Sequence, residues 1–226
     1  LLLWPPGSST LRIWDHLVEA LVRRFRVVRF DIRGVGRSVP VPNDDDQYTF
    51  ERYARDACAV LDALAIPRCH VWSQSWGSRP AIVFSANNPQ RVVSAALYAA
   101  NLELPDVPAQ REGSRRAAER QRAAGHVPEP PSTGFDRHAA PEEVPKAMGA
   151  LRKFRLAEVV DQLTMPVLIG TGDCDPNLVS SREIAARVAG ARLVVFEDVG
   201  HNAVLERPDI ALEAFLEFHD SLRPAG

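Results

Sequence analysis

Three side chains in this sequence have the types that nucleophilic catalysis needs, and each follows a short apolar run: Ser75, Asp175 and His201. A serine hydroxyl is a poor nucleophile until a base takes its proton. An imidazole can be that base because it titrates near neutral pH. A carboxylate can orient the imidazole and stabilise its cation. The residue types therefore predict acyl transfer, with Ser75 as nucleophile, His201 as general base and then acid, and Asp175 as the orienting group.

Each of these assignments has an alternative. Ser75 could simply occupy a tight turn, and His201 could be an ordinary loop histidine. Asp173 lies two residues before Asp175 and is a rival for the carboxylate. The other histidines do not follow a predicted strand in this way, and we expect them at the surface or in packing contacts: His16, His70, His126, His138 and His219.

Strand-like and helix-like segments alternate along the chain. Apolar runs predict strands at 1–4, 26–30, 69–72, 92–98, 167–170 and 193–196. Apolar stripes at helical spacing predict helices at 14–24, 48–64, 75–87, 180–188 and 208–222. Because the strands are apolar throughout, helices should cover both faces of a mostly parallel sheet of about six strands, which is an α/β fold. Ser75, Asp175 and His201 would then meet at the carboxyl ends of the strands.

The alternation stops at residues 101–155, a segment rich in Pro, Arg, Ala and Glu. We interpret it as a short helical lid inserted into a single domain that spans residues 1–226. Its arginines indicate either a solvated helix face or a lid that attracts a carboxylate-bearing substrate: Arg111, Arg115, Arg116, Arg120 and Arg122.

Composition and charge exclude several classes of partner. The formal net charge of −2 indicates no nucleic-acid partner. The apolar runs are the length of strands, so no membrane span is expected. Cys58, Cys69 and Cys174 are odd in number and widely spaced, which predicts reduced thiols in a cytoplasmic protein. No cofactor and no metal is expected.

Four stretches resemble the α/β-hydrolase fold superfamily: "WDHLVEALVRRFRVVRFDIRGVGRS", "YARDACAVLDALAIPRCHVWSQSWGS", "PVLIGTGDCDP" and "FEDVGHNAVLERPDIALEAFLEF". Within it, "LRIW" and "FRVVRFDIRGVGRS" look most like 3-oxoadipate enol-lactonases, whereas "SWGS" looks like proline iminopeptidases. The resemblance implies a nucleophile elbow at Ser75, with Ser73 and Gly77 as its small neighbours. It also implies that the acid is Asp175 rather than Asp173.

The oxyanion hole departs from the pattern of these relatives. The backbone N–H of Trp76 is the expected first donor, at the start of the helix. The second donor should come from the loop after the first strand, where this chain has Pro5 and Pro6, which lack an N–H. Gly7 or Ser8 would have to take that role.

The first predicted strand also departs from the pattern, because no β-hairpin precedes it in this sequence. The strand at 26–30 would then form a bare edge of the sheet. We expect either a further N-terminal piece or a homodimer that covers this edge.

The resulting hypothesis is a serine hydrolase that cleaves an ester or lactone of a small organic substrate through an acyl-enzyme. One alternative is an aminopeptidase of the proline-iminopeptidase type, which would need an acidic anchor such as Glu103 or Asp106. A second is a non-catalytic binding protein on a hydrolase scaffold. Trp4 and Trp72 are expected either in the core or in the pocket wall.

Overall fold

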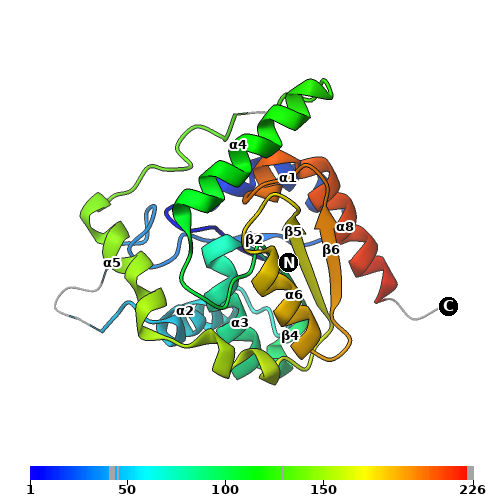
Figure 1. Ribbon diagram of the computed structural model, residues 1–226. Helices are drawn as coiled ribbons and strands as arrows, with labels where there is room; N and C mark the ends of the chain where they lie inside the picture. Colours follow the sequence, from blue (N-terminus) through cyan, green and yellow to red (C-terminus); the bar gives the residue numbers. More distant parts are fainter. Residues whose placement is uncertain (41–43, 45, 129, 223–226) are drawn as a thin grey trace.

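The computed structural model describes residues 1–40, 44, 46–128 and 130–222, which form one six-stranded sheet with helices around it (Figure 1). The strand order is β2-β1-β3-β4-β5-β6, and every neighbouring pair is parallel. The strands are β1 (Leu2–Trp4), β2 (Val28–Arg29), β3 (Cys69–Gln74), β4 (Val92–Tyr98), β5 (Val167–Gly172) and β6 (Arg192–Phe196). The predicted α/β class and strand number are confirmed.

Both faces of the sheet are buried, which explains the continuous apolar runs. Successive residues of a strand point to opposite faces. In β1, Leu2 and Trp4 pack in one core, and Leu3 packs in the other. Each of these side chains is fully buried.

Two groups of helices cover the faces. The longer helices are α1 (Asp15–Leu21), α2 (Phe50–Ala63), α3 (Ser78–Asn87), α4 (Val107–Ala123), α6 (Leu178–Arg187) and α8 (Pro208–Ser221). Helices α2, α3 and α6 contribute Leu61, Phe84 and Ile184 to the core on one face. Helices α1 and α8 contribute Leu17 and Phe215 to the core on the other.

Two predicted segments have different bounds. The strand predicted at 26–30 is only two residues long, β2 (Val28–Arg29), and it pairs with β1. Strand β1 ends before Pro5, which has no N–H to continue the hydrogen-bond ladder, so β2 has no longer partner to follow. The helix predicted from Ser75 begins as a 3₁₀ turn (Ser75–Gly77), and α3 itself starts at Ser78. Strand β2 does lie at an edge of the sheet, as expected.

The segment predicted as a lid contains α4 and the short α5 (Val144–Met148), joined by turns (Figure 1). Helix α4 begins at a capped turn, in which Asp106 Oδ1 accepts a hydrogen bond of 3.0 Å from Ala109 N–H. The helix then passes over the loops that follow β5 and β6. None of the helices formed by the described residues has both the length and the apolar character that a bilayer crossing needs.

Candidate active site

Ser75 sits at a strained corner between β3 and the 3₁₀ turn. Its φ is +57°, a left-handed conformation that side chains rarely adopt. The corner also brings two backbones into contact, because a Cβ on Gly77 would lie 2.2 Å from Pro5 O. Ser73 fits beneath the corner with a fully buried hydroxyl, whose Oγ lies 3.2 Å from Ala96 O and 3.0 Å from Ser78 Oγ. The chain therefore accommodates Ser73 with hydrogen bonds.

The structure brings together the three residues predicted from the sequence. Ser75 Oγ lies 2.5 Å from His201 Nε2, and His201 Nδ1 lies 3.0 Å from Asp175 Oδ2. An ionised carboxylate can only accept, so the Nδ1–H donates to Asp175 and Nε2 accepts from the Ser75 hydroxyl. The Asp175 side chain is fully buried, and that of His201 is 12% exposed. The imidazole is thus held so that its unprotonated nitrogen, Nε2, faces the Ser75 hydroxyl.

Asp173, the rival carboxylate, points elsewhere. Its Oδ1 accepts a hydrogen bond of 3.2 Å from Val199 N–H, and its Oδ2 lies 3.7 Å from Arg120 Nη1 on α4. It supports the loop that carries His201 and does not contact the imidazole. The choice of Asp175 agrees with this geometry.

Side chains from three other elements hold the loop of His201. Ser114 on α4 accepts a hydrogen bond of 3.1 Å from His201 N–H, and Gln74 Nε2 donates one of 2.7 Å to His201 O. Glu206, in the short helix α7 (Ala203–Glu206), accepts from Ser114 Oγ at 2.7 Å and from Gly200 N–H at 2.5 Å. Sequence reasoning missed the contacts of Ser114 and Gln74 because they join segments far apart in the chain.

A family model described as the alpha/beta hydrolase fold matches residues 4–156. The chain belongs to the α/β-hydrolase fold family. This membership assigns it to the hydrolases, so the enzyme class and family predicted from the sequence are confirmed.

Relatives and solved structures extend the similarity over nearly all of this α/β-hydrolase. A protein of Caulobacter sp. (strain K31), named provisionally as the carbamate hydrolase RutD, is 26% identical over 94% of this chain and 86% of its own length. Rhodomycin D methylesterase DnrP of Streptomyces peucetius is 27% identical over 89% of this chain and 84% of its own. The enol-lactonase from Burkholderia xenovorans LB400 shares the fold, with a TM-score of 0.78, 22% identity, and coverage of 97% of this chain and 90% of that one.

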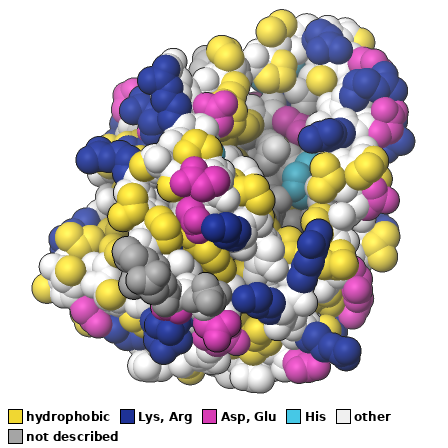
Figure 2. All heavy atoms as spheres, turned by 90° about the vertical axis from the view of Figure 1, so that its left-hand side faces the viewer, with side chains coloured by type: hydrophobic (Ala, Val, Ile, Leu, Met, Phe, Trp, Pro, Cys, Tyr) yellow, Lys and Arg dark blue, Asp and Glu magenta, His cyan; other side chains and the backbone are white. Residues whose placement is uncertain are grey.

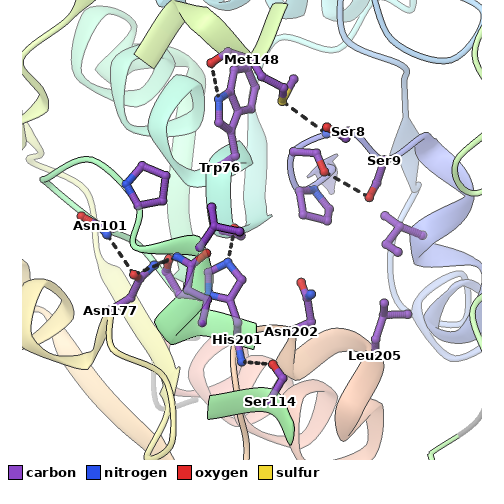
Figure 3. A pocket seen from close by; sticks show the side chains of 18 of the residues that line it. Ser8, Ser9, Trp76, Asn101, Ser114, Met148, Asn177, His201, Asn202 and Leu205 are labelled. Atoms are coloured by element: carbon purple, nitrogen blue, oxygen red, sulfur yellow. Dashed lines mark hydrogen bonds between the residues drawn. The ribbon is translucent and has the colours of Figure 1, made fainter. Parts of the chain in front are cut away.

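A pocket of about 680 Å³ opens over Ser75 and His201 (Figure 3). In the space-filling view, one face of the molecule is hollowed, with a histidine side chain inside the hollow and apolar, basic and acidic side chains around it (Figure 2). Apolar residues from the 3₁₀ turn before α1, the segment 101–155 and α7 line part of the wall: Ile13, Phe135, Met148, Leu151 and Leu205. Trp4 and Trp72 are fully buried in the core and line no part of this pocket.

Polar groups also line the pocket, and no described Asp or Glu side chain is among them. Glu103 and Asp106, which were considered as acidic anchors, are exposed outside the pocket. Of the histidines, only His201 lines it among the described residues. Within that same part of the chain, no three His, Cys, Asp or Glu side chains are grouped as metal ligands would be.

The loop after β1 has one amide near the site that none of the hydrogen bonds between described residues uses. Pro5 and Pro6 have none, Ser8 N–H points to Met148 Sδ at 3.3 Å, and Ser9 N–H donates to Pro6 O at 3.3 Å. Gly7 lines the pocket beside Trp76, and none of the hydrogen bonds between described residues uses its N–H.

Proposed function

We propose that this α/β-hydrolase is a serine hydrolase that cleaves an ester or lactone of a small organic substrate through an acyl-enzyme. The observation that carries the proposal is the continuous hydrogen-bonded chain from Ser75 Oγ through His201 to Asp175, with the hydroxyl end at the floor of the pocket. A hydroxyl, an imidazole and a buried carboxylate in this order form a base-activated nucleophile.

In the first half of the reaction, Ser75 Oγ attacks the carbonyl carbon of the substrate while its proton passes to His201 Nε2. The carbonyl π electrons move to oxygen and give a tetrahedral oxyanion. The oxyanion then collapses, the bond to the leaving alcohol oxygen breaks, and that oxygen takes the proton from Nε2. The product of this half is an ester of Ser75. Asp175 stabilises the imidazolium that forms in between.

Water completes the second half. It attacks the acyl carbon and gives a proton to Nε2. Collapse of the second oxyanion breaks the bond to Ser75 Oγ, which recovers its proton from Nε2. The acid leaves, and the enzyme returns to its starting state with no net change in its own groups.

Two backbone amides are suited to the oxyanion. Trp76 N–H belongs to the first turn of a 3₁₀ helix, where amides have no partner within the helix. Gly7 N–H is the candidate for the second donor, since the amides of Ser8 and Ser9 are engaged. Loss of one such donor typically costs about 100- to 1000-fold in rate, so two donors favour an active enzyme over the binding-protein alternative.

The substrate class rests on the pocket and on the names of relatives. A methylesterase and an enol-lactonase both act on an acyl–oxygen bond, and both resemble this chain. The aminopeptidase alternative would need a carboxylate to hold the free amine of its substrate. No described carboxylate lines the pocket, so that alternative has less support.

The test is covalent labelling with a fluorophosphonate, followed by peptide mapping and by turnover of para-nitrophenyl butyrate. We expect the label on Ser75 in the wild type, and no label in the variants Ser75→Ala and His201→Ala. Ser221→Ala, at the end of α8, is the matched control and should label like the wild type. A folded wild-type protein that takes no label and hydrolyses no ester would refute the proposal.

A further inference from the structure

Arg79 is a buried cation in the wall of the pocket. It is the second residue of α3 and follows Ser75 by four positions, a separation of about one helical turn. Only 4% of its surface is exposed, and it lines the pocket together with Ser75 and His201. Sequence reasoning missed it because a single arginine in an apolar helix indicates no particular role.

Arg79 forms no ion pair with a carboxylate among the described residues. Its Nη2 donates to the backbone carbonyl of Glu103, and the exposed carboxylate of Glu103 acts on the charge of Arg79 only from beyond ion-pair distance. Other partly buried arginines behave differently: Arg29 forms an ion pair with Asp15, and Arg33 forms one with Asp56. A buried charge without a counter-ion is costly, so its retention calls for a partner that the chain itself does not supply.

The neighbours of Arg79 form a fixed polar wall. Asn177 Oδ1 accepts hydrogen bonds from Asn101 Nδ2 at 2.9 Å and from Gln110 Nε2 at 3.1 Å, and all three side chains are largely buried. Asn101 Oδ1 accepts from Glu103 N–H at 2.6 Å, which ties this wall to the carbonyl that holds Arg79. Asn101 and Asn177 lie on one side of His201, and Ser8 and Ser9 lie toward the other (Figure 3).

A second arginine adds to the positive charge. Arg111 on α4 lines the same pocket, is exposed, and forms no ion pair with a described carboxylate. Two other arginines of α4 do form ion pairs, Arg115 with Glu112 and Arg120 with Asp198. Burial lowers the pKa of Arg79 to about 10, which leaves it charged at neutral pH. The pocket thus contains two cations and no described anion.

We propose that Arg79 binds a free carboxylate of the substrate, so that the substrate is an ester or lactone that carries a second, ionised acid group. This inference rests on the proposed function and names the substrate class for the same site. The planar guanidinium matches a carboxylate in a bidentate pair, which would compensate the buried charge of Arg79 and orient the scissile carbonyl toward Ser75. Arg111 would attract the same group from the rim.

The test compares two esters with the same acyl length and leaving group: mono-para-nitrophenyl glutarate, which carries a carboxylate, and para-nitrophenyl pentanoate, which does not. We expect the wild type to show a kcat/KM at least about tenfold higher for the glutarate ester, as a charge-assisted pair implies. Arg79→Met should remove most of this preference, and Arg79→Lys should keep part of it. Arg23→Met, an exposed arginine outside the pocket, is the matched control and should keep the full ratio.

Several outcomes would overturn the inference, and they are distinguishable from failure of the proposed function. Turnover of both esters that depends on Ser75, with a wild-type ratio near or below one, refutes the carboxylate site and leaves the serine hydrolase intact. An unchanged ratio of the two kcat/KM values in a folded Arg79→Met protein would likewise refute the carboxylate site and leave the serine hydrolase intact. If neither ester reacts and Ser75 takes no fluorophosphonate, the proposed function fails and this inference fails with it.

A binding measurement covers the case in which Arg79→Met does not fold. Calorimetric titration of Ser75→Ala with monomethyl glutarate, which carries a free carboxylate, should give binding at least about tenfold tighter than with methyl pentanoate, which carries none. Equal or undetectable affinity for the two esters would overturn the inference without any variant at Arg79.

Discussion

At the scale of single residues, the two aspartates of the turn after β5 have separate tasks. Asp175 is fully buried and receives the Nδ1–H of His201, whereas Asp173 receives the backbone N–H of Val199. They are two residues apart in the chain, and their side chains contact different groups of the same loop, the backbone of Val199 and the imidazole of His201. A pair of conservative substitutions can therefore separate orientation of the imidazole from support of the loop.

We expect Asp175→Asn to lower kcat by about 10³- to 10⁴-fold, because an amide cannot hold the imidazole in the tautomer that accepts the serine proton. Asp173→Asn is the matched control, and it should lower kcat by less than about tenfold, since its oxygen can still accept from Val199. Steady-state turnover of para-nitrophenyl butyrate measures both. Equal losses in the two variants would contradict the division of tasks.

The three reactive residues could be predicted from the sequence because each is a polar residue that follows an apolar run, and parallel strands gather such positions at one end. Arg79 and Ser114 could not be predicted in this way. Their importance comes from what faces them across the pocket, and those contacts join segments far apart in the chain. The residue pattern of a short stretch does not reveal which distant segments will contact it in the folded protein.

At the scale of elements, helix α4 belongs to the framework of the site. Its Gly113 packs directly on the turn of the acid, where an added Cβ would lie 2.0 Å from Cys174 O. Its next residue, Ser114, binds the loop of His201. The helix that covers the pocket thus contacts the segments carrying both Asp175 and His201.

We expect Gly113→Ala to destabilise the protein by about 1–3 kcal/mol, since a backbone oxygen must move to admit the methyl group. It should also lower kcat by about tenfold or more, because displacement of Cys174 moves the adjacent Asp175. Gly149→Ala is the control: it lies in the same lid, and its Cβ would meet nothing within 4 Å. Urea unfolding and ester turnover are the measurements. Normal kinetics in Gly113→Ala would show that α4 can shift without disturbing the acid.

Most elements of the fold were predictable, and the exceptions have local causes. The strands have unbroken apolar runs, whereas α4 has a mean composition too polar to show a clear stripe. Its start nevertheless has a recognisable signal, with Asp106 as the cap and Pro108 in the first turn. Strand β2 is shorter than predicted because its partner β1 ends at Pro5, and strand length depends on the neighbouring strand as well as on its own residues.

At the scale of the whole molecule, a cluster of rings on the side of the sheet opposite α3 links acid stability to one half-buried histidine. His70 on β3 stacks edge-on against His219 of α8, with ring centroids 4.6 Å apart, and its Nδ1 lies 2.8 Å from Ser94 Oγ. Burial, with a further contribution from His219, lowers the pKa of His70 to about 4.

Because the pKa of His70 is lower in the folded than in the unfolded chain, the unfolded chain binds the proton more tightly. Folding stability should therefore fall as the pH falls from about 6.5 to about 4, and no loss from this group should occur above that window. His70→Asn should show a smaller difference in free energy of unfolding between the two ends of the window. Urea unfolding at each pH measures it, and an identical difference in both proteins would rule His70 out.

The predicted homodimer also belongs to this scale and stays a prediction. Edge strand β2 has only two residues, and the side chain of Arg29 is held in an ion pair with Asp15. Short, charged edges discourage strand pairing. Sedimentation equilibrium of the purified chain measures whether it dimerises, and a monomer would rule out a second copy at this edge.

Ser75, Asp175 and His201 come from turns that follow three different strands. Ser75 and His201 are 126 positions apart in the sequence. No fragment of the sheet can place the serine hydroxyl on the imidazole, because β3, β5 and β6 must all be in register beforehand. During refolding, helices should return early, while the ability to react with a phosphonylating agent should return only with the long-range strand pairing, which is slow. Labelling of Ser75 therefore marks the completion of folding, and a chain arrested part-way should not react with the phosphonylating agent.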